Sequence, residues 1–257
     1  MAPVLVFDIE TVPDVGGLRR IWGLGPEVSE EAVVELALQR RRQATGGDFL
    51  PCHVQRVVAI ACALRERDTV RVWSLGGAKD EERELVKRFF DGIGKYTPQL
   101  VSWNGSGFDL PVLHYRALVH GVSAPRYWEL GDDDRDFRYN NYLSRFHTRH
   151  IDLMDILASY QNRAFAPLHE IARLCGFPGK LGMEGSQVWE AWRSGEIDAV
   201  RAYCETDVAN TYLLFQRFQL LRGQLTSETY EREQRLFRDF LADQKAPHWR
   251  EFADAWK

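Results

Sequence analysis

Short apolar runs rich in β-branched residues alternate with amphipathic stretches over the first half of the chain. The opening run, Val4 to Glu10, precedes a Thr-Val-Pro break, which is typical of a buried strand that ends in a turn. The same reading predicts further strands and helices. We expect strands at 4–10, 55–66, 69–75 and 99–103, and helices at 17–45, 80–94 and from the Asn104–Gly107 turn to about residue 119.

Helical periodicity dominates the second half of the chain, after an irregular and highly charged segment at 122–150. Strands that are followed repeatedly by helices indicate an α/β sheet with helices packed on its faces. Neither an internal repeat nor a linker rich in Pro, Gly or Ser divides the chain, so we expect one α/β domain with a helical C-terminal part. The helices expected there are 153–161, 167–175, 186–193, 196–222, 226–243 and a short one near 248–256.

Composition narrows the class of protein. Of the 257 residues, 45% are hydrophobic and 27% are charged, which excludes general disorder. The net charge of −4 disfavours a protein that coats nucleic acid, although it permits an enzyme that gathers acids at a metal site.

The chain carries no sign of a membrane or secretory protein. Its longest apolar run, Val57 to Leu64, is too short to cross a bilayer, and its N-terminus lacks the basic start and apolar stretch of a signal peptide. No C-x-x-C pair occurs, so we expect reduced thiols in a cytoplasmic protein and neither a disulfide framework nor a zinc site. The four cysteines are Cys52, Cys62, Cys175 and Cys204.

The first candidate motif is Asp8-x-Glu10, at the end of the opening strand. Side chains at positions i and i+2 of a strand share a face, about 6.5–7 Å apart. One face therefore carries Val4, Val6, Asp8 and Glu10, and the other carries Leu5, Phe7 and Ile9. Buried carboxylates need cations or water, but a strand end that reaches solvent explains the pair equally simply.

The second candidate motif is Asn104-Gly-Ser-Gly-Phe108-Asp109-Leu-Pro111, which joins a strand to a helix. Its glycines permit a sharp turn, and Pro111 suits the first turn of a helix. Asp109 lies near the start of that helix. It is a candidate metal ligand, although a capping aspartate is the simpler alternative.

The third candidate motif is Tyr203-Cys204-Glu205-Thr206-Asp207, inside the long C-terminal helix. At about 100° per residue, Asp207 falls within a mostly apolar stripe, and Tyr203 lies one turn before it. A carboxylate on the core-facing stripe is anomalous. A buried acid paired with an arginine would also explain Asp207, whereas Glu205 points away and is expected to be solvated.

One site would explain all three motifs. Four carboxylates from two strand ends and two helices would repel one another, and two divalent cations would cancel their charge. Oxygen ligands favour Mg²⁺ or Mn²⁺ over softer metals. We therefore expect a site with two divalent cations.

The order Asp-x-Glu, N-G-x-x-F-D and Y-x-x-x-D resembles the DEDD exonuclease superfamily of ribonuclease-H-like fold, and the spacing of Tyr203 resembles its DEDDy subgroup. The chain is similar to stand-alone bacterial proteins described as predicted 3′–5′ exonucleases related to the proofreading domain of family B DNA polymerases. The resemblance runs from residue 4 to about 220 and includes GKLGMEGSQVWEAW (179–192) and RAYCETDVANTYLLFQRF (201–218).

This resemblance implies a ribonuclease-H-like mixed β-sheet flanked by helices. It assigns 1–225 to the exonuclease domain, with 226–257 as a C-terminal helical extension of the same domain. It also implies that Tyr203 orients the attacking water and that Asp8 bridges both cations. The implied metal ligands are Asp8, Glu10, Asp109 and Asp207.

The resemblance suggests fewer substrate contacts. Asn104 and Phe108 resemble positions that contact the terminal nucleotide, but a turn-forming asparagine and a core phenylalanine are the alternatives. Lys180 could meet a phosphate, or it is an ordinary surface lysine. The 122–150 segment interleaves basic and aromatic residues, which suits either a single strand or a packing loop. Asp152 is expected to cap the helix that follows, and an acid that supports the metal ligands is the alternative.

The prediction is a metal-dependent exonuclease that removes 5′-mononucleotides from the 3′ ends of single-stranded nucleic acid, DNA in the first instance, without a membrane partner. Three alternatives stay open: an exoribonuclease with the same site, a catalytically silent nucleic-acid-binding module, and a structure-selective endonuclease. The motifs cannot separate DNA from RNA, because that choice depends on contacts near the 2′-hydroxyl.

Overall fold

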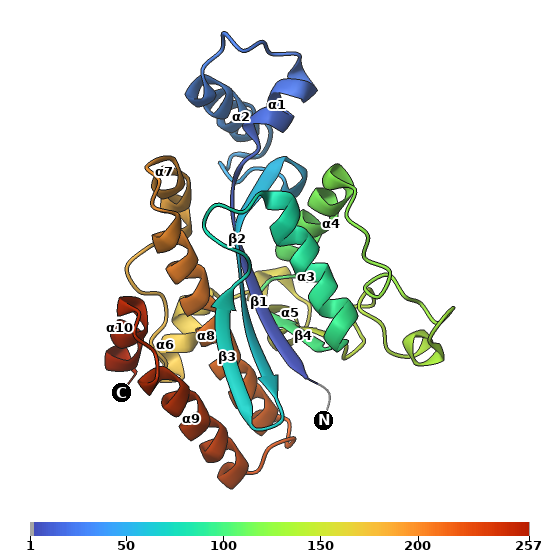
Figure 1. The fold of residues 1–257 in the computed structure, drawn as a ribbon, viewed down its shortest axis with the longest axis vertical. Helices are drawn as coiled ribbons and strands as arrows, with labels where there is room; N and C mark the ends of the chain where they lie inside the picture. Colours follow the sequence, from blue (N-terminus) through green and yellow to red (C-terminus); the bar gives the residue numbers. More distant parts are fainter. Residues whose placement is uncertain (1–2, 257) are drawn as a thin grey trace.

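A five-stranded mixed sheet lies at the centre of the computed structural model, which describes residues 3–256. Its strand order is β3–β2–β1–β4–β5 (Figure 1). The antiparallel pairs are β1–β2 and β2–β3, whereas β4 runs parallel to β1 and to β5. The strands are β1 (Val4–Pro13), β2 (Gln55–Glu66), β3 (Thr69–Ser74), β4 (Gln99–Ser102) and β5 (His150–Asp152).

Strand β1 separates two hydrophobic cores, as its alternating sequence predicts. Val4 and Val6 belong to one core, whereas Leu5, Phe7 and Ile9 belong to the other. The register with β2 shifts between Glu10 and Thr11, which is the signature of a β-bulge. A bulge re-aims side chains, and this one falls where the strand carries its acids.

Helices cover both faces of the sheet (Figure 1). On one face α3 (Glu82–Tyr96) and α4 (Asp109–His120) pack over β2. On the other, the 25-residue helix α8 (Ile197–Leu221) crosses β1, β2 and β3. Around α8 lie α6 (Leu168–Leu174), α7 (Val188–Arg193), α9 (Ser227–Ala242) and α10 (Pro247–Ala255). The predicted mixed α/β sheet flanked by helices, with a helical C-terminal part, is confirmed.

The segment between β1 and β2 differs from the single helix predicted at 17–45. It forms two helices, α1 (Val15–Trp22) and α2 (Glu30–Thr45), which stand beyond one end of the sheet at the top of Figure 1. Gly23 ends α1 in the left-handed conformation with φ of 64°, which other residues adopt only at a cost. The pair has a small core of its own, made of Leu18, Val33, Ala37, Leu50 and Val54.

The sequence pattern predicted no strand directly before the helix at 153–161, but residues 150–152 form β5 beside β4. The helix that follows, α5 (Leu153–Leu157), also ends earlier than residue 161, since Ser159 and Tyr160 have positive φ angles of 50° and 59°. Asp152 does cap α5, as predicted, by accepting bonds from Met154 and Asp155 amides. Short 3₁₀ turns occupy Cys52–Val54, Arg135–Arg138, Asn162–Ala164 and Gly185–Gln187.

The 122–150 segment is largely irregular, as expected. Tyr127, Phe137 and Tyr142 are buried in the core beneath α3 and α4, so the packing interpretation applies to these three rings. The four cysteines are free thiols. Between residues 3 and 256, no helix has both the length and the apolar character that crossing a membrane requires.

Candidate active site

All eight residues singled out from the sequence line one cavity of about 970 Å³ at the far end of β1. Further walls come from α2, the Asn104–Phe108 turn, the 165–168 loop and the start of α7. The cavity therefore gathers segments from almost the whole length of the chain. The eight residues are Asp8, Glu10, Asn104, Phe108, Asp109, Lys180, Tyr203 and Asp207.

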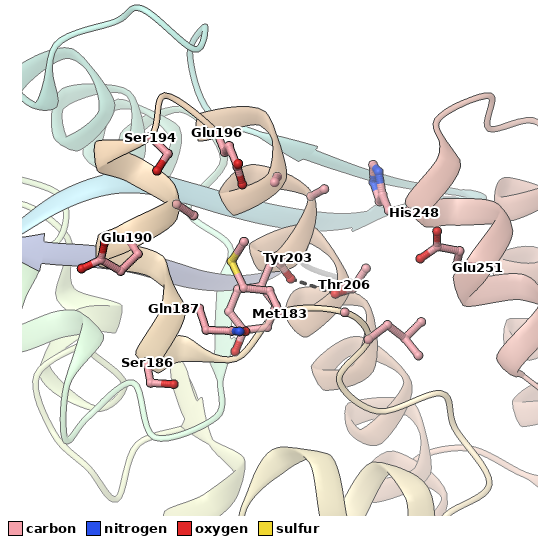
Figure 2. Close-up of a pocket in the computed structure, with 15 residues that line it drawn as sticks. Met183, Ser186, Gln187, Glu190, Ser194, Glu196, Tyr203, Thr206, His248 and Glu251 are labelled. Carbon is pink, nitrogen blue, oxygen red and sulfur yellow. Dashed lines mark hydrogen bonds between the residues drawn. The ribbon is translucent and has the colours of Figure 1, made fainter.

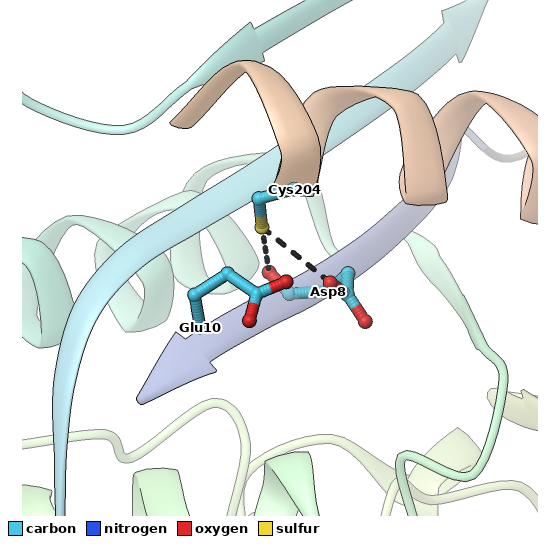
Figure 3. A group of neighbouring side chains, drawn as sticks. All are labelled: Asp8, Glu10 and Cys204. Atoms are coloured by element: carbon cyan, nitrogen blue, oxygen red, sulfur yellow. Dashed lines mark hydrogen bonds between the residues drawn. The ribbon is translucent and has the colours of Figure 1, made fainter. Parts of the chain in front are cut away.

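The end of β1 supplies the first two carboxylates. Oxygen atoms of Asp8 and Glu10 and the sulfur of Cys204 lie within 4.8 Å of one another (Figure 3). The Cys204 thiol donates to the backbone oxygen of Asp8 at 3.4 Å, and so attaches α8 to the strand. Sequence reasoning missed Cys204, although its position near the apolar stripe of the helix could have placed it on this side.

Asp109 reaches the same strand end from α4. It is the first residue of that helix, and its Oδ1 accepts a hydrogen bond from the Ile9 amide at 3.1 Å. The carboxylate therefore bonds to β1, whereas a capping aspartate would bond to amides in the first turn of its own helix. Only 4% of Asp109 is exposed.

Asp152 holds the turn that precedes Asp109. Its two carboxylate oxygens accept hydrogen bonds from the Asn104 and Ser106 amides at 2.9 and 2.8 Å. Asn104 itself adopts a φ of 65°, a conformation that asparagine tolerates, so it forms the turn as well as lining the cavity. The sequence indicated the capping role of Asp152 but not its contact with this turn.

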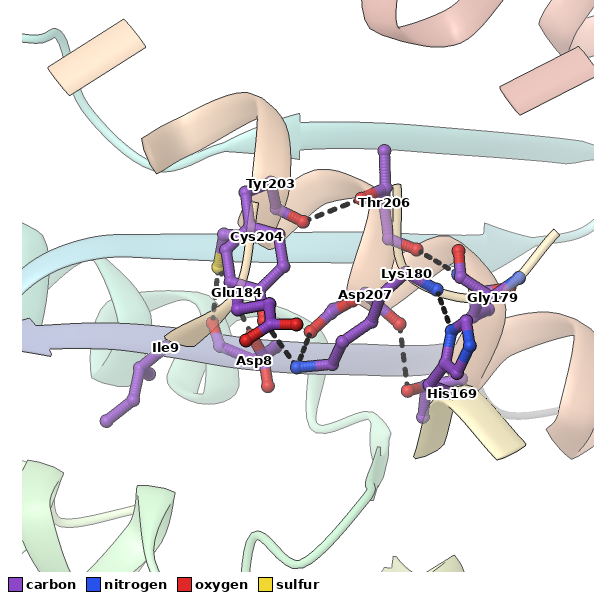
Figure 4. Close-up of polar contacts among 12 residues, drawn as sticks. Asp8, Ile9, His169, Gly179, Lys180, Glu184, Tyr203, Cys204, Thr206 and Asp207 are labelled. Carbon is purple, nitrogen blue, oxygen red and sulfur yellow. Dashed lines mark hydrogen bonds and ion pairs between the residues drawn. The ribbon is translucent and has the colours of Figure 1, made fainter. Parts of the chain in front are cut away.

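Helix α8 carries the remaining acid. Asp207 is 4% exposed, and its Oδ2 pairs with the Lys180 ammonium at 3.1 Å, while Lys180 also donates to the Tyr203 hydroxyl (Figure 4). The interpretation of Lys180 as an ordinary surface lysine was therefore wrong. Asp207 is a buried acid with a cationic partner, but this partner is Lys180 and not the arginine that the sequence alternative expected. Asp207 Oδ1 is buried and has no hydrogen-bond partner.

Burial dominates the electrostatics of these acids. Desolvation, reinforced by the neighbouring carboxylates, raises the pKa of Asp8 and Glu10 well above the usual range. Desolvation also raises the pKa of Asp109 to about 7, and it raises the pKa of Asp207 although the Lys180 ammonium opposes that shift. The protein therefore does not fully compensate the four acids for their loss of water or, at Asp8 and Glu10, for the repulsion between carboxylates.

Lys180 supplies part of the missing positive charge. Burial alone would lower its pKa, but the Asp207, Asp8 and Glu10 carboxylates outweigh burial and raise it, so the ammonium stays charged. One ammonium cannot balance four carboxylates. Carboxylates that line one cavity with an excess of negative charge, and an unpaired buried oxygen on Asp207, fit divalent cations, which prefer hard oxygen donors.

Glu205 is not solvated, in contrast to the sequence prediction. Its carboxylate accepts a hydrogen bond from Ser74 Oγ at 2.7 Å and pairs with His248 at 3.0 Å. These contacts attach α8 to β3 and α10, and they lower the pKa of Glu205 despite its burial. The wheel position was right, but this side of α8 faces other elements and not water.

A second cavity of about 690 Å³ lies between α7 and α8 (Figure 2). It shares Tyr203 and Ser186 with the first cavity, so the tyrosine ring stands between the two. Its other polar lining residues with acidic or imidazole side chains are Glu190, Glu196, Glu251 and His248. This mostly acidic lining does not suit a phosphate group.

Comparison with known proteins places the chain in a family. Residues 47–256 match the family model described as a predicted 3′–5′ exonuclease related to the exonuclease domain of family B DNA polymerase. The chain belongs to this family. The match covers most of the chain and leaves β1, α1 and α2 outside it.

Individual relatives agree with the family. The chain is 27% identical over 152 residues to a DNA polymerase of Pyrococcus glycovorans and 25% identical over 151 residues to DNA polymerase 1 of Pyrococcus abyssi, in each case over 56% of this chain. It spans about a fifth of the length of these curated relatives, 19% in both cases.

The fold agrees as well. The family B DNA polymerase of Pyrobaculum calidifontis superimposes with a TM-score of 0.50 and 20% sequence identity, over 86% of this chain and 25% of the polymerase. The expected ribonuclease-H-like α/β fold is consistent with this likeness, and the resemblance seen in the sequence motifs is confirmed at the level of the family.

Proposed function

We propose that the chain is a divalent-metal-dependent 3′–5′ exonuclease that removes 5′-mononucleotides from the 3′ ends of single-stranded nucleic acid, with DNA as the first candidate. One observation carries the proposal. Carboxylates from β1, α4 and α8 line one cavity together with Tyr203, and the buried Oδ1 of Asp207 has no partner there.

In this proposal Asp8, Glu10, Asp109 and Asp207 hold two cations, Mg²⁺ or Mn²⁺. When bound, such cations activate a water and stabilise the leaving oxygen of a phosphodiester. The protein's part is to hold the carboxylates in place. The Cys204 thiol contacts Asp8 Oδ2 at 3.5 Å, and the Ile9 amide donates to Asp109, so each contact fixes a carboxylate to a neighbouring element.

Tyr203 would orient the attacking water and not remove its proton. Desolvation and the adjacent carboxylates raise the pKa of Tyr203 far above its usual value, so the phenol stays protonated near neutral pH. The water oxygen bonds to phosphorus, the bond from phosphorus to O3′ breaks, and O3′ takes up a proton. The products are a 5′-mononucleotide and a strand that is one nucleotide shorter.

Substrate contacts are proposed for three residues. Asn104 and Phe108 lie on the turn beside Asp109, where a terminal nucleotide would meet them. Lys180 would pair with a phosphate once cations neutralise Asp207, since its ammonium already lies among the acids. We further propose that 226–257 belong to the same domain as 1–225, because Phe237 and Phe252 pack in one core with Tyr212.

The test is product analysis with 5′-labelled single-stranded DNA and RNA of matched sequence, in Mg²⁺ and in Mn²⁺. We expect a ladder that shortens from the 3′ end and releases 5′-mononucleotides. Asp8→Asn and Asp207→Asn should each abolish release, whereas Asp254→Asn, which changes an exposed acid of α10, should retain it.

The alternatives predict other outcomes. An exoribonuclease would shorten only the RNA, and an endonuclease would cut oligomers whose 3′ end is blocked. A silent binding module would retain the strand and release nothing with either metal. Release by either Asp variant at the wild-type rate would refute the assigned site.

A further inference from the structure

The α1–α2 segment, residues 14–50, forms one wall of the candidate active site. Val34 and Leu38 of α2 line the cavity, together with Asp48, Phe49 and Leu50 of the loop that returns to the sheet. Residues 14–46 lie outside the family match. The match therefore leaves out α1 and α2, as it does β1 with Asp8 and Glu10, whereas the part of the wall that runs from Asp48 to Leu50 lies inside it.

Phe49 is the unusual residue of this wall. Its side chain is 65% exposed although it lines the cavity, so it lies at the cavity's edge. Its ring centre lies 5.1 Å from that of Phe108, at an angle of 60°. The two rings come from segments far apart in the chain and together present an aromatic surface beside Asp109.

The backbone on either side of Phe49 is fixed. The Phe49 carbonyl accepts a hydrogen bond from Arg41 Nε at 2.8 Å. The next residue, Leu50, is buried, and its carbonyl accepts a hydrogen bond from Gln55 at 3.1 Å. An exposed ring on an anchored backbone is positioned before any ligand arrives, which lowers the entropic cost of binding.

The charge of the cavity makes an aromatic contact valuable. Among the described residues that line it, Lys180 is the one basic side chain, against the carboxylates of Asp8, Glu10, Asp48, Asp109 and Asp207. Apart from Lys180 and bound cations, the described lining residues therefore offer a strand no charged group that attracts its phosphates. Stacking of bases on aromatic rings is the other general source of affinity for single strands, and it does not depend on charge.

We propose that Phe49, positioned by the α1–α2 segment, is a specificity-determining residue that stacks with the 3′-terminal base of a single strand, next to Phe108. The inference deepens the proposed function and rests on it for the identity of the strand end. Because the two rings contact each other, the base stacks on their exposed surface. A base paired to a complementary strand would have to unpair to reach this surface.

The test compares single-stranded DNA oligomers that end in an adenine nucleotide or in an abasic nucleotide. Binding is measured in Ca²⁺ and release of nucleotides in Mn²⁺, with the full-length protein. We expect the wild type to bind the adenine end about fivefold or more tightly, the lower end of what base–aromatic stacking contributes. Phe49→Ala should remove this preference, and Phe49→Trp should restore it.

Phe146→Ala is the matched control. Phe146 is 74% exposed and its ring lies 5.4 Å from that of Tyr160, but it does not line the cavity. This variant should keep the wild-type preference. Thermal melts verify that each variant folds.

The inference fails if the wild type binds both ends equally, or if Phe49→Ala keeps the preference. The release measurement separates the two proposals. A preference that depends on Phe49 without any release in Mn²⁺ would refute the exonuclease proposal and leave the role of Phe49 standing. Release without a preference for the adenine end would support the exonuclease proposal and refute the role of Phe49.

Discussion

Asp152 accepts backbone hydrogen bonds from two segments that are remote in sequence. It caps α5 through the Met154 and Asp155 amides, and it fixes the turn before Asp109 through the Asn104 and Ser106 amides. A single carboxylate thus sets the position of one wall of the cavity. Its contribution is positional, because it does not itself line the cavity.

Replacing Asp152 should therefore damage both stability and activity. In Asp152→Ala the helix loses its cap and two turn amides lose their acceptor, so we expect the free energy of unfolding to fall by about 2–4 kcal/mol. Urea denaturation measures this loss, and nucleotide release should show a raised KM as the turn shifts. Asp155→Ala is the control, since it loses only a 3.4 Å pair with the half-exposed Arg145 and should cost less than about 1 kcal/mol.

The buried His150 makes the stability of the protein depend on pH. It is buried, and its Nε2 lies 2.8 Å from Ser102 Oγ. Desolvation lowers the pKa of His150 to about 4, whereas an unfolded histidine titrates near pH 6.5. Between these values the unfolded chain binds a proton that the folded chain does not, so stability falls as the pH falls.

When the pH is lowered from 7.5 to 5, we expect the free energy of unfolding to fall by about 2 kcal/mol more in the wild type than in His150→Gln. Glutamine can keep the hydrogen bond to Ser102 but has no titration in this range. Urea denaturation of both proteins at several pH values gives the difference. Parallel pH profiles for the two proteins would contradict the assignment.

At the scale of elements, a buried ion network joins α1, α3 and α4. Arg116 of α4 pairs with Asp14, the cap of α1, at 2.6 Å and donates from Nε to Glu82 of α3 at 2.7 Å. Both Arg116 and Glu82 are almost fully buried. The network ties the base of the α1–α2 segment to the helix that begins with Asp109.

Breaking this network should be costly. Arg116→Met leaves the buried charges of Asp14 and Glu82 without their guanidinium partner, so we expect the free energy of unfolding to fall by about 3–5 kcal/mol. Adding Asp14→Asn and Glu82→Gln should recover part of the loss, which chemical denaturation can detect. Lys87→Met, which removes an exposed pair with Asp91 on α3, should change stability by less than about 1 kcal/mol.

Most elements could be predicted because the alternation of apolar and polar residues is a local property of the sequence. β5 could not, since it has three residues and becomes a strand only by pairing with β4. The break between α1 and α2 depends on the left-handed Gly23, whose conformation a helical pattern does not reveal.

The residues of the site also divide into those that a local sequence pattern reveals and those that depend on contacts between distant segments. Asp207 could be found because a charged residue on a core-facing stripe violates the local pattern, and Asp109 because it follows a glycine-containing turn in a recognisable motif. The partners of Asp152, Lys180 and Glu205 could not, because each lies in another segment, and a pattern contains no information about contacts. Cys204 was missed for a different reason, since a small apolar residue on an apolar stripe violates nothing.

At the scale of the whole molecule, the four carboxylates at one cavity lower the stability of the folded protein. Mutual repulsion and desolvation penalise the acids in the absence of cations, with Lys180 as a partial compensation. Cations that bind only the folded protein should reverse this penalty. Stability should therefore depend on divalent metal.

We expect Mn²⁺ at about 100 times its dissociation constant to add about 2.7 kcal/mol, which raises Tm by roughly 5–10 °C over the value in EDTA. Asp109→Asn should show little of this shift. In EDTA the same variant should be more stable than the wild type, because it removes one charge and its side-chain oxygen can still accept from Ile9. Differential scanning calorimetry distinguishes both effects, and equal shifts in both proteins would contradict the proposed ligand set.

Helix α8 presents Tyr203 and Asp207 to the cavity, while its next turns, through Val208, Tyr212 and Phe215, form the centre of a core. The same rigid element therefore belongs both to the core and to the candidate active site. On heating, its middle turns can loosen only when the surrounding core loosens. Loss of activity and loss of the fold on heating should consequently occur together. We expect no stage at which the fold is intact and the candidate active site is disordered.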